Sequence, residues 1–406
     1  MNILRSPKAV WAMLAVILLI AVYLRIDFLT SVKHNVSHDS VYYDEMVKRL
    51  IEKGVYAYKA ETPNAQVAPG FPLFMAGIYK LVDYTHHDPF PYLRYANLLL
   101  SMVNLVLIYF IACKLVNARI GLIATGAAAT NPPFIWANGA ILTEVLATFL
   151  FLSYIYRQLR AIQTGRGRDS LIAGALLGCT ALVRPEFLPV VVPIYLFYWL
   201  WTKNRAAWKL LLLACIGLSI VMSPWWIRNL VTLNKVVLTA TQTNPFHAGT
   251  YPYKNWDDGL VDRHGKTQQE VAIERLKIGF TEHTWLFLKW YTVGKLDYIY
   301  SRMYFGSGHT PMYKVIPLRN QYHTAMIWTG VLGLILTLRR WRQPLTLIAL
   351  ILVVMSFIRL LFIPEYRYNF IAMPLFIIIG SAAAEMIARW IYARISPSFT
   401  KEVKEV

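Results

Sequence analysis

Residues that could carry out acid–base or phosphate chemistry occur at five separate places in the 406-residue sequence. Carboxylates and guanidinium groups dominate these places. A carboxylate can accept the proton of an attacking hydroxyl, and arginines can hold a leaving phosphate. The combination therefore predicts group transfer from a phosphate carrier. The five places are Asp39, Glu144, the pair Arg184 and Glu186, Arg228, and the run Glu365-Tyr366-Arg367-Tyr368.

Most of these residues also have a structural interpretation, which the sequence leaves open. Arg184 and Glu186 would pair at a helix end, and residues 365–368 would hold a local ion pair. Arg228 would extend its charged end to a membrane surface. Glu144 is different, because a lone carboxylate inside an apolar run has no local partner and is costly at membrane depth.

The acidic stretch around residues 37–51 has helical spacing. Apolar side chains at Val41, Met46, Leu50 and Ile51 would form a stripe on one side of such a helix, with charged side chains between them. We therefore expect a helix here, directly after the first long apolar segment.

This expected helix has two interpretations. Ser37 or Asp39 would cap its amino end, which makes it an ordinary interfacial helix with a solvated charged face. Alternatively, carboxylates gathered just outside a bilayer in a strongly basic chain indicate a catalytic site.

Composition indicates a helical membrane protein. Hydrophobic residues make up 57% of the chain, its mean hydropathy is +0.43, and the apolar residues come in long blocks. The formal net charge of +19 first indicates cytoplasmic loops rich in Lys and Arg. The three cysteines lie in apolar runs and show neither a disulfide framework nor metal-ligand spacing.

The apolar blocks predict about ten membrane-spanning helices. The first shows no small-residue cleavage site and is long enough to span, which predicts an uncleaved helix. Phe71–Val82 is short for a span, and we expect a half-inserted or interfacial helix there. The expected spans are Ala9–Ile26, Leu93–Cys113, Arg119–Trp136, Ile141–Tyr156, Leu171–Val183, Phe187–Trp201, Lys209–Ile227, Thr324–Leu338, Pro344–Ile363 and Phe370–Ile391.

Basic residues fall in alternate loops, which predicts the orientation. By the positive-inside rule these loops and both termini are cytoplasmic, in the inner or plasma membrane. All five candidate places then lie on the opposite, periplasmic or extracellular side. The basic residues are Lys114, Arg119, Arg157, Arg160, Arg166, Arg168, Lys203, Arg205, Lys209, Arg339, Arg340, Arg342, Arg389, Arg394, Lys401 and Lys404.

Three parts are expected along the chain. Residues 1–227 form an amino-terminal membrane module whose first outer loop spans about 32–92. Residues 228–323 are too hydrophilic to span and form an outer segment, with an amphipathic stretch at Gln268–Phe280. Residues 324–406 return to the membrane.

The order of the motifs resembles that of a known group of enzymes, the GT-C membrane glycosyltransferases of the protein-mannosyltransferase, aminoarabinose-transferase and RgtA-like group. Each motif is weak alone, but their order over Ala9–Tyr368 is fairly specific. In sequence they are one span, Asp39 before Tyr43, Pro69-Gly70-Phe71-Pro72-Leu73, Thr143-Glu144, Leu182-Val183-Arg184-Pro185-Glu186, Ser223-Pro224-Trp225-Trp226-Ile227-Arg228-Asn229 and Arg367-Tyr368.

The resemblance implies an inverting transferase that takes a sugar from a polyprenyl-phosphate donor on the outer face. The acceptor would be a hydroxyl of a lipid, a glycan or a protein, with no nucleic-acid partner. The general base of the family maps to Asp39, and its second acidic position maps to Glu144. The substrate-binding positions would be Arg184, Glu186, Arg228, Arg367, Tyr368, Tyr43, Asp44 and Glu45.

The sequence departs from the family in two ways. Asp39 is followed by Ser40, although an acidic pair is common there, so Asp44-Glu45 is an alternative pair. Ala68 stands where some members place a phosphate-binding lysine. No metal is expected, because arginines can neutralise the leaving phosphate.

Two other functions remain open from the sequence. A transporter or flippase of an anionic lipid would use the arginines along a route, but such proteins usually show inverted repeats, and none is visible. A ligase or polymerase of lipid-linked oligosaccharides would act on a diphosphate-linked chain.

Overall fold

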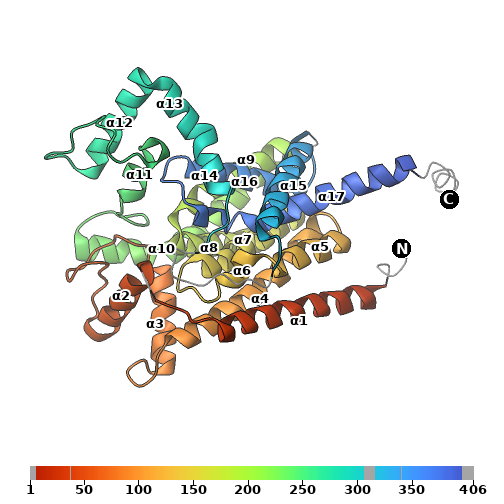
Figure 1. Ribbon diagram of the computed structural model, residues 1–406, viewed down its shortest axis with the longest axis horizontal. Coiled ribbons are helices and arrows are strands. Elements are labelled where there is room, and N and C mark those ends of the chain that lie inside the picture. The colour runs from red at the N-terminus through yellow and green to blue at the C-terminus, as the bar shows by residue number, and fades with distance from the viewer. Residues whose placement is uncertain (1–5, 37, 306–315, 340, 396–406) are drawn as a thin grey trace.

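The computed structural model describes residues 6–36, 38–305, 316–339 and 341–395, with side chains up to residue 392. Every regular element within these ranges is a helix, so the all-α class predicted from the sequence is confirmed. Figure 1 shows the longest helices running along the long axis of the molecule, with shorter ones gathered at one end.

Four helices in the described part of the chain are long and apolar enough to cross a membrane. They coincide with the expected spans that begin at Ala9, Leu93, Lys209 and Phe370. The amino end of the first and the carboxyl end of the last lie at the same end of the molecule (Figure 1). The four are α1 (Pro7–Ser31), α4 (Phe90–Leu115), α10 (Ala206–Leu233) and α17 (Met373–Ile395).

The other six expected spans are helical too, but several are short or broken, so the count of ten spans is not confirmed. The segment Arg119–Trp136 forms two helices, because Asn131 caps a new one and two prolines without amide hydrogens follow it. These helices are α5 (Ala118–Ala129), α6 (Pro132–Trp136), α7 (Glu144–Thr164), α8 (Gly167–Val183), α9 (Val191–Thr202) after the 3-10 turn η2 (Pro185–Val190), α15 (Arg319–Arg339) and α16 (Leu345–Arg359).

The acidic stretch of the first outer loop forms α2 (Asp39–Lys53), as expected. Its inward side differs from the prediction, because Met46 and Val47 are buried whereas Val41 is exposed. Of the two expected caps, Asp39 does not bond to a backbone amide of the helix. Ser37 lies outside the described residues, and the Asp39 side chain pairs with a distant arginine instead of a backbone amide.

Two further outer helices match expected segments. The apolar segment after the first loop forms α3 (Gly70–Val82). The amphipathic segment forms α12 (Gln268–Glu282), which starts at a capping box between Thr267 and Glu270. The remaining outer elements are α11 (Asn244–Gly249), η3 (Pro252–Lys254), α13 (Thr284–Lys289), the π-turn η4 (Trp290–Gly294), α14 (Lys295–Tyr300) and η5 (Tyr366–Asn369).

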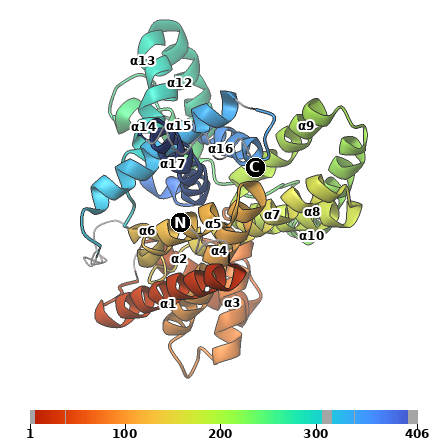
Figure 2. The same ribbon diagram turned by 90° about the vertical axis from the view of Figure 1, so that its right-hand side faces the viewer.

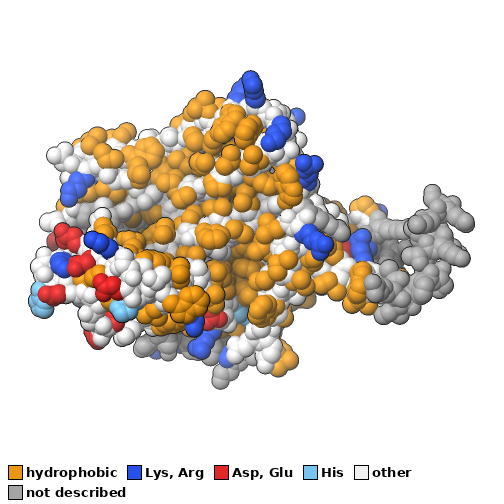
Figure 3. Space-filling model, turned by 90° about the horizontal axis from the view of Figure 1, so that it is seen from above, with side chains coloured by type: hydrophobic (Ala, Val, Ile, Leu, Met, Phe, Trp, Pro, Cys, Tyr) orange, Lys and Arg blue, Asp and Glu red, His pale blue; other side chains and the backbone are white. Residues whose placement is uncertain are grey.

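Charged side chains are sorted along the long axis (Figure 3). Acidic and basic side chains mix at the left end of this view, a wide hydrophobic surface follows, and mainly basic side chains occur toward the right. This agrees with the loop asymmetry read from the sequence. The basic residues Arg340, Lys401 and Lys404 and the side chain of Arg394 lie outside the described part.

Small residues allow α8 and α10 to cross closely. A Cβ on Gly174 would meet the carbonyl oxygen of Ala214, and a Cβ on Gly217 would meet that of Leu171. Such close contacts between small residues are typical of packed membrane helices. They hold α8 against α10, and Arg184 directly follows the last residue of α8.

Replacing Gly174 by Val should destabilise the protein by about 1–3 kcal/mol, because the added methyl groups must push α8 away from α10. Thermal unfolding of the purified protein in detergent measures this loss. Gly77→Ala is the control, since no atom lies within 4 Å of a Cβ at that helical position. Equal melting temperatures for the two variants would contradict the packing described above.

Candidate active site

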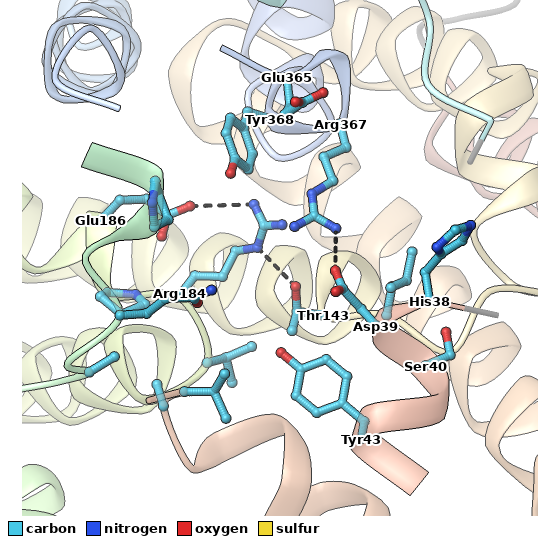
Figure 4. Close-up of a pocket in the computed structure, with 18 of the residues that line it drawn as sticks. His38, Asp39, Ser40, Tyr43, Thr143, Arg184, Glu186, Glu365, Arg367 and Tyr368 are labelled. Atoms are coloured by element: carbon cyan, nitrogen blue, oxygen red, sulfur yellow. Dashed lines mark hydrogen bonds and ion pairs between the residues drawn. The ribbon is translucent and has the colours of Figure 1, made fainter. Parts of the chain in front are cut away.

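A cavity of about 720 Å³ lies at the end of the molecule that carries α2 and α11. Its walls come from parts of the chain that are far apart in sequence: the start of α2, the turn before α7, η2, the end of α16 and η5. Figure 4 shows polar side chains from these elements pointing into one common space. Tertiary packing therefore collects most of the charged residues that the sequence singled out.

Asp39 and Arg367 meet in this cavity, although 328 positions separate them in the chain. Nη1 of Arg367 donates to Oδ2 of Asp39 at 3.0 Å, while the Asp39 side chain stays 39% exposed. Burial alone lowers the pKa of Arg367, but Glu144, Tyr368 and Asp39 raise it above its usual value. Asp39 is thus an accessible carboxylate beside a permanent cation.

The backbone just before Asp39 is strained. His38 lines the cavity and has a φ of 50°, in the region that side chains other than glycine rarely adopt. Such strain costs about 1–3 kcal/mol and is common at functional sites. This backbone conformation lets α2 begin at Asp39, so the Asp39 side chain lies at the first residue of the helix.

Arg184 is the most heavily bonded side chain of the site. Its Nε donates to Thr143 Oγ1 at 3.0 Å, its Nη2 to Glu144 Oε1 at 2.8 Å, and its Nη1 to Glu186 Oε1 at 3.3 Å. Arg184 and Glu144 are both buried, so this pair is shielded from water. Arg184 is thus the partner of Glu144 that the sequence could not supply.

Arg359 completes the cluster and was missed by the sequence analysis. It is buried at the end of α16, lines the cavity, and has Nη2 3.4 Å from Glu186 Oε1. Its Nε has no hydrogen-bond partner among the described residues. The signal was present, because Arg359 interrupts the apolar run of an expected span, the same argument that singled out Glu144.

Tyr368 lies among the three arginines. The guanidinium carbons of Arg184, Arg359 and Arg367 are 5.6, 4.9 and 5.7 Å from the centre of its ring. An aromatic face attracts cations and so helps to hold like charges close together. Figure 4 shows Tyr368 above Arg184 and beside Arg367.

Tyr43 forms the opposite wall, with its hydroxyl toward the centre of the cavity (Figure 4). Burial raises the pKa of this hydroxyl, and the negative charge of Asp39 raises it further. Tyr43 therefore keeps its proton at neutral pH and can donate a hydrogen bond to a bound group.

Three expected site residues lie elsewhere. Arg228 donates to the backbone carbonyls of Tyr56 and Asn64 at 3.1 and 2.9 Å, which ties the first outer loop to α10. Asp44 accepts from a tyrosine hydroxyl and pairs with a lysine one turn along α2. Glu45 is exposed, and none of these three residues lines the cavity.

Glu365 and Arg367 do not form the local pair that was one interpretation of the sequence. Glu365 pairs instead with Lys254 at 2.7 Å, which connects η5 to the outer segment. Arg367 therefore pairs with Asp39 rather than with Glu365. Among the described residues, no group of three or more His, Cys, Asp or Glu side chains is arranged to hold a metal ion.

Residues 66–227 match a family described as dolichyl-phosphate-mannose-protein mannosyltransferase. This region includes Glu144, Arg184 and Glu186 but not Asp39 or Arg367. A search of curated proteins finds no match.

The structure is similar to solved membrane glycosyltransferases. The archaeal oligosaccharyltransferase AglB from Archaeoglobus fulgidus, in complex with an inhibitory peptide and a dolichol-phosphate, aligns with a TM-score of 0.60 at 15% identity over 96% of this chain and 52% of that chain. A form of the Archaeoglobus enzyme tethered to an acceptor peptide gives 0.59 at 15% identity, over 96% and 51%. ArnT from Cupriavidus metallidurans bound to undecaprenyl phosphate gives only 0.47 at 14%, over 97% and 80%.

The chain thus has the GT-C glycosyltransferase fold, and the resemblance inferred from its motifs is confirmed. The chain spans about half the length of the oligosaccharyltransferase chains that it matches.

Replacing Arg184 by Gln should destabilise the protein by about 3–5 kcal/mol, because it leaves the buried Glu144 carboxylate without its cation. Thermal unfolding in detergent measures the loss. Lys48→Gln is the control, since it removes a half-exposed pair with Asp44 that is worth only about 0.2–1 kcal/mol. A double variant, Arg184→Gln with Glu144→Gln, should recover part of the loss.

Proposed function

We propose that the protein is an inverting glycosyltransferase that moves a sugar from a polyprenyl-phosphate donor to an acceptor hydroxyl. The observation that carries the proposal is the accessible Asp39 carboxylate, 3.0 Å from Arg367, in a cavity whose far wall presents Arg184 and Arg359. One side of this cavity can accept a proton, and the other can hold a phosphate.

The proposed reaction is a single displacement. The acceptor oxygen attacks the anomeric carbon of the sugar from the face opposite the phosphate, and its proton passes to Asp39. The bond between the anomeric carbon and the phosphate oxygen breaks, and its electron pair stays on the phosphate. A positioned general base contributes roughly 10²–10⁴-fold to the rate, and holding both substrates together supplies roughly 7–11 kcal/mol.

Arginines supply the stabilisation of the leaving group in this scheme. Arg359 has an unused Nε, and Arg367 can exchange Asp39 for the phosphate. That exchange would release Asp39 to act as a base when the donor is bound. Tyr43 can donate a further hydrogen bond from the opposite wall. Arg184, whose donors Nε, Nη1 and Nη2 are already bonded, would orient Glu144 and Glu186.

Polyprenyl phosphate is proposed as the carrier from two observations. The family that matches residues 66–227 is described as dolichyl-phosphate-mannose-protein mannosyltransferase. A solved protein of the same fold was determined with dolichol-phosphate. The proposal places the cavity on the periplasmic or extracellular side and both termini in the cytoplasm, following the basic loops.

The proposal also assigns parts of the site to parts of the chain. Residues 1–227 contribute the base and Arg184, and residues 324–406 contribute Arg359 and Arg367. Residues 228–323 would form the outer wall and contact the acceptor. Arg228, Asp44 and Glu45 are assigned to the scaffold, because their bonds or positions direct them away from the cavity.

Asp39→Asn should lower the transfer rate by roughly 10²–10⁴-fold, because the amide cannot accept the acceptor proton. The assay uses purified protein in detergent with a polyprenyl-phosphate sugar, which needs no gradient and so excludes transport as the source of product. Glu45→Gln, on the same helix but outside the cavity, is the control and should keep the wild-type rate. A wild-type rate for Asp39→Asn would end the assignment of the base.

Arg359→Gln should raise the KM for the donor by roughly 10–100-fold, since a hydrogen bond to a charged group is worth about 1.5–3 kcal/mol. Arg359→Lys, which keeps the charge, should restore part of the affinity. Arg389→Gln, which removes an exposed cation paired with Glu385, serves as a matched control. An unchanged KM for the donor in Arg359→Gln would show that this residue does not bind the phosphate.

Transfer should continue in excess chelator, because the scheme assigns the phosphate charge to arginines. The measurement is the initial rate before and after chelation. Activity that disappears and returns with a divalent ion would contradict the scheme. Comparing monophosphate-linked with diphosphate-linked donors separates this reaction from that of an oligosaccharide ligase or polymerase.

A further inference from the structure

The helical segment 284–300, formed by α13, η4 and α14 without interruption, has two apolar sides. One side is buried, with Phe287, Trp290 and Ile299 almost without exposure. The other side carries Trp285 at 79%, Val293 at 67% and Leu288 at 45% exposure. A helix that packs against its own protein on one side needs no large hydrophobic residues on the other, so this second side calls for a partner.

The exposed residues form one stripe. Positions 285, 288, 289, 292 and 293 recur at intervals of three or four residues, so they lie on one side of α13 and of the π-turn that continues it. The stripe contains Trp285, Leu288 and Val293, with Lys289 and Thr292 between them. A tryptophan and aliphatic residues combined with a lysine are typical of helices that lie in a membrane interface.

The position of the stripe indicates what covers it. In Figure 1, α12 lies on the left of α13, at the end of the molecule that carries the outer loops, and the Phe287 ring packs against Gly279 of α12. The side of α13 away from α12 is therefore directed toward the membrane-crossing part of the molecule. Figure 2 shows α12 and α13 extending past α15, α16 and α17, so lipid rather than protein would lie beneath them.

We propose that this stripe, defined as Trp285, Leu288, Lys289 and Val293, docks on the outer leaflet of the bilayer. The apolar side chains enter the boundary between head groups and acyl chains, and Lys289 reaches lipid phosphates. Figure 3 shows a wide hydrophobic surface next to the end of the molecule where acidic and basic side chains mix.

Docking would act on the cavity through α14. Asn369 of η5 donates to the carbonyls of Ile299 and Arg302 at 3.0 and 2.9 Å. Lys295 Nζ donates to the carbonyl of Leu360, directly after Arg359, at 2.6 Å. The segment that rests on the leaflet therefore also holds the two stretches of backbone that carry Arg367 and Arg359. This second step rests on the proposed function, whereas the docking itself does not.

Fluorescence quenching by lipid tests the docking directly. Leu288→Cys is labelled with bimane in a background without Cys113, Cys179 and Cys215 and reconstituted in vesicles whose acyl chains carry bromine. The label should lose fluorescence relative to unbrominated vesicles. His264→Cys is the control, because its side chain is 97% exposed on a loop of the outer segment and should show no loss. No difference between the two labelled positions would overturn the proposal.

A second variant tests whether the apolar side chains of the stripe hold the segment on the bilayer. Trp285→Ser with Val293→Ser should abolish quenching of the label at position 288 while the protein remains monodisperse. In vesicles this variant should transfer sugar more slowly than wild type, with equal rates in detergent. A label that is unquenched by lipid in a protein of twice the monomer mass would show that a second copy covers the stripe, and the proposal would fall. Quenching without any transferase activity would refute the proposed function and leave the docking intact.

Discussion

The ion pair between Arg184 and Glu144 is the interaction on which the rest of the site depends. Neither group can stay charged in an apolar interior alone, and their 2.8 Å contact gives each the partner that burial demands. The pair also sets geometry. Arg184 holds Thr143 and Glu186 at the same time, which fixes the turn before α7 against η2 and so defines one wall of the cavity.

The charges of the site are balanced before any substrate enters. Asp39, Glu144 and Glu186 face Arg184, Arg359 and Arg367, and the Tyr368 ring lies among the three guanidinium groups. In the proposed scheme, a phosphate that enters this site would find the unused Nε of Arg359 and would take further donors from a carboxylate. Arg367 is the arginine that can most readily exchange its carboxylate partner for a phosphate, because that partner, Asp39, is accessible to water. Under the proposed function, binding of the phosphate and release of the Asp39 carboxylate to act as a base would be one event.

The outer segment adds support from the side. Its short helices pack around Trp290 and Phe287, and its last helix bonds to the backbone next to Arg359 and Arg367. Lys254 adds an ion pair to Glu365 in the same turn. Residues 228–323 were expected as a hydrophilic segment with one amphipathic stretch, and they also bond to the backbone next to two of the three clustered arginines.

The sequence by itself determined the class of the fold, most helix positions and most of the charged residues that meet at the cavity. Apolar blocks of about 20 residues can only be long helices in a membrane, and a charge such as Glu144 within them must have a partner. The same rule would have found Arg359. Only the tertiary structure decided which charges meet. Asp39 and Arg367 are 328 positions apart, and Arg228 and Asp44 carry the same charges as site residues yet bond to the scaffold. Spacing along one helix fixes which residues share its face, but partners on different helices are set by how those helices pack.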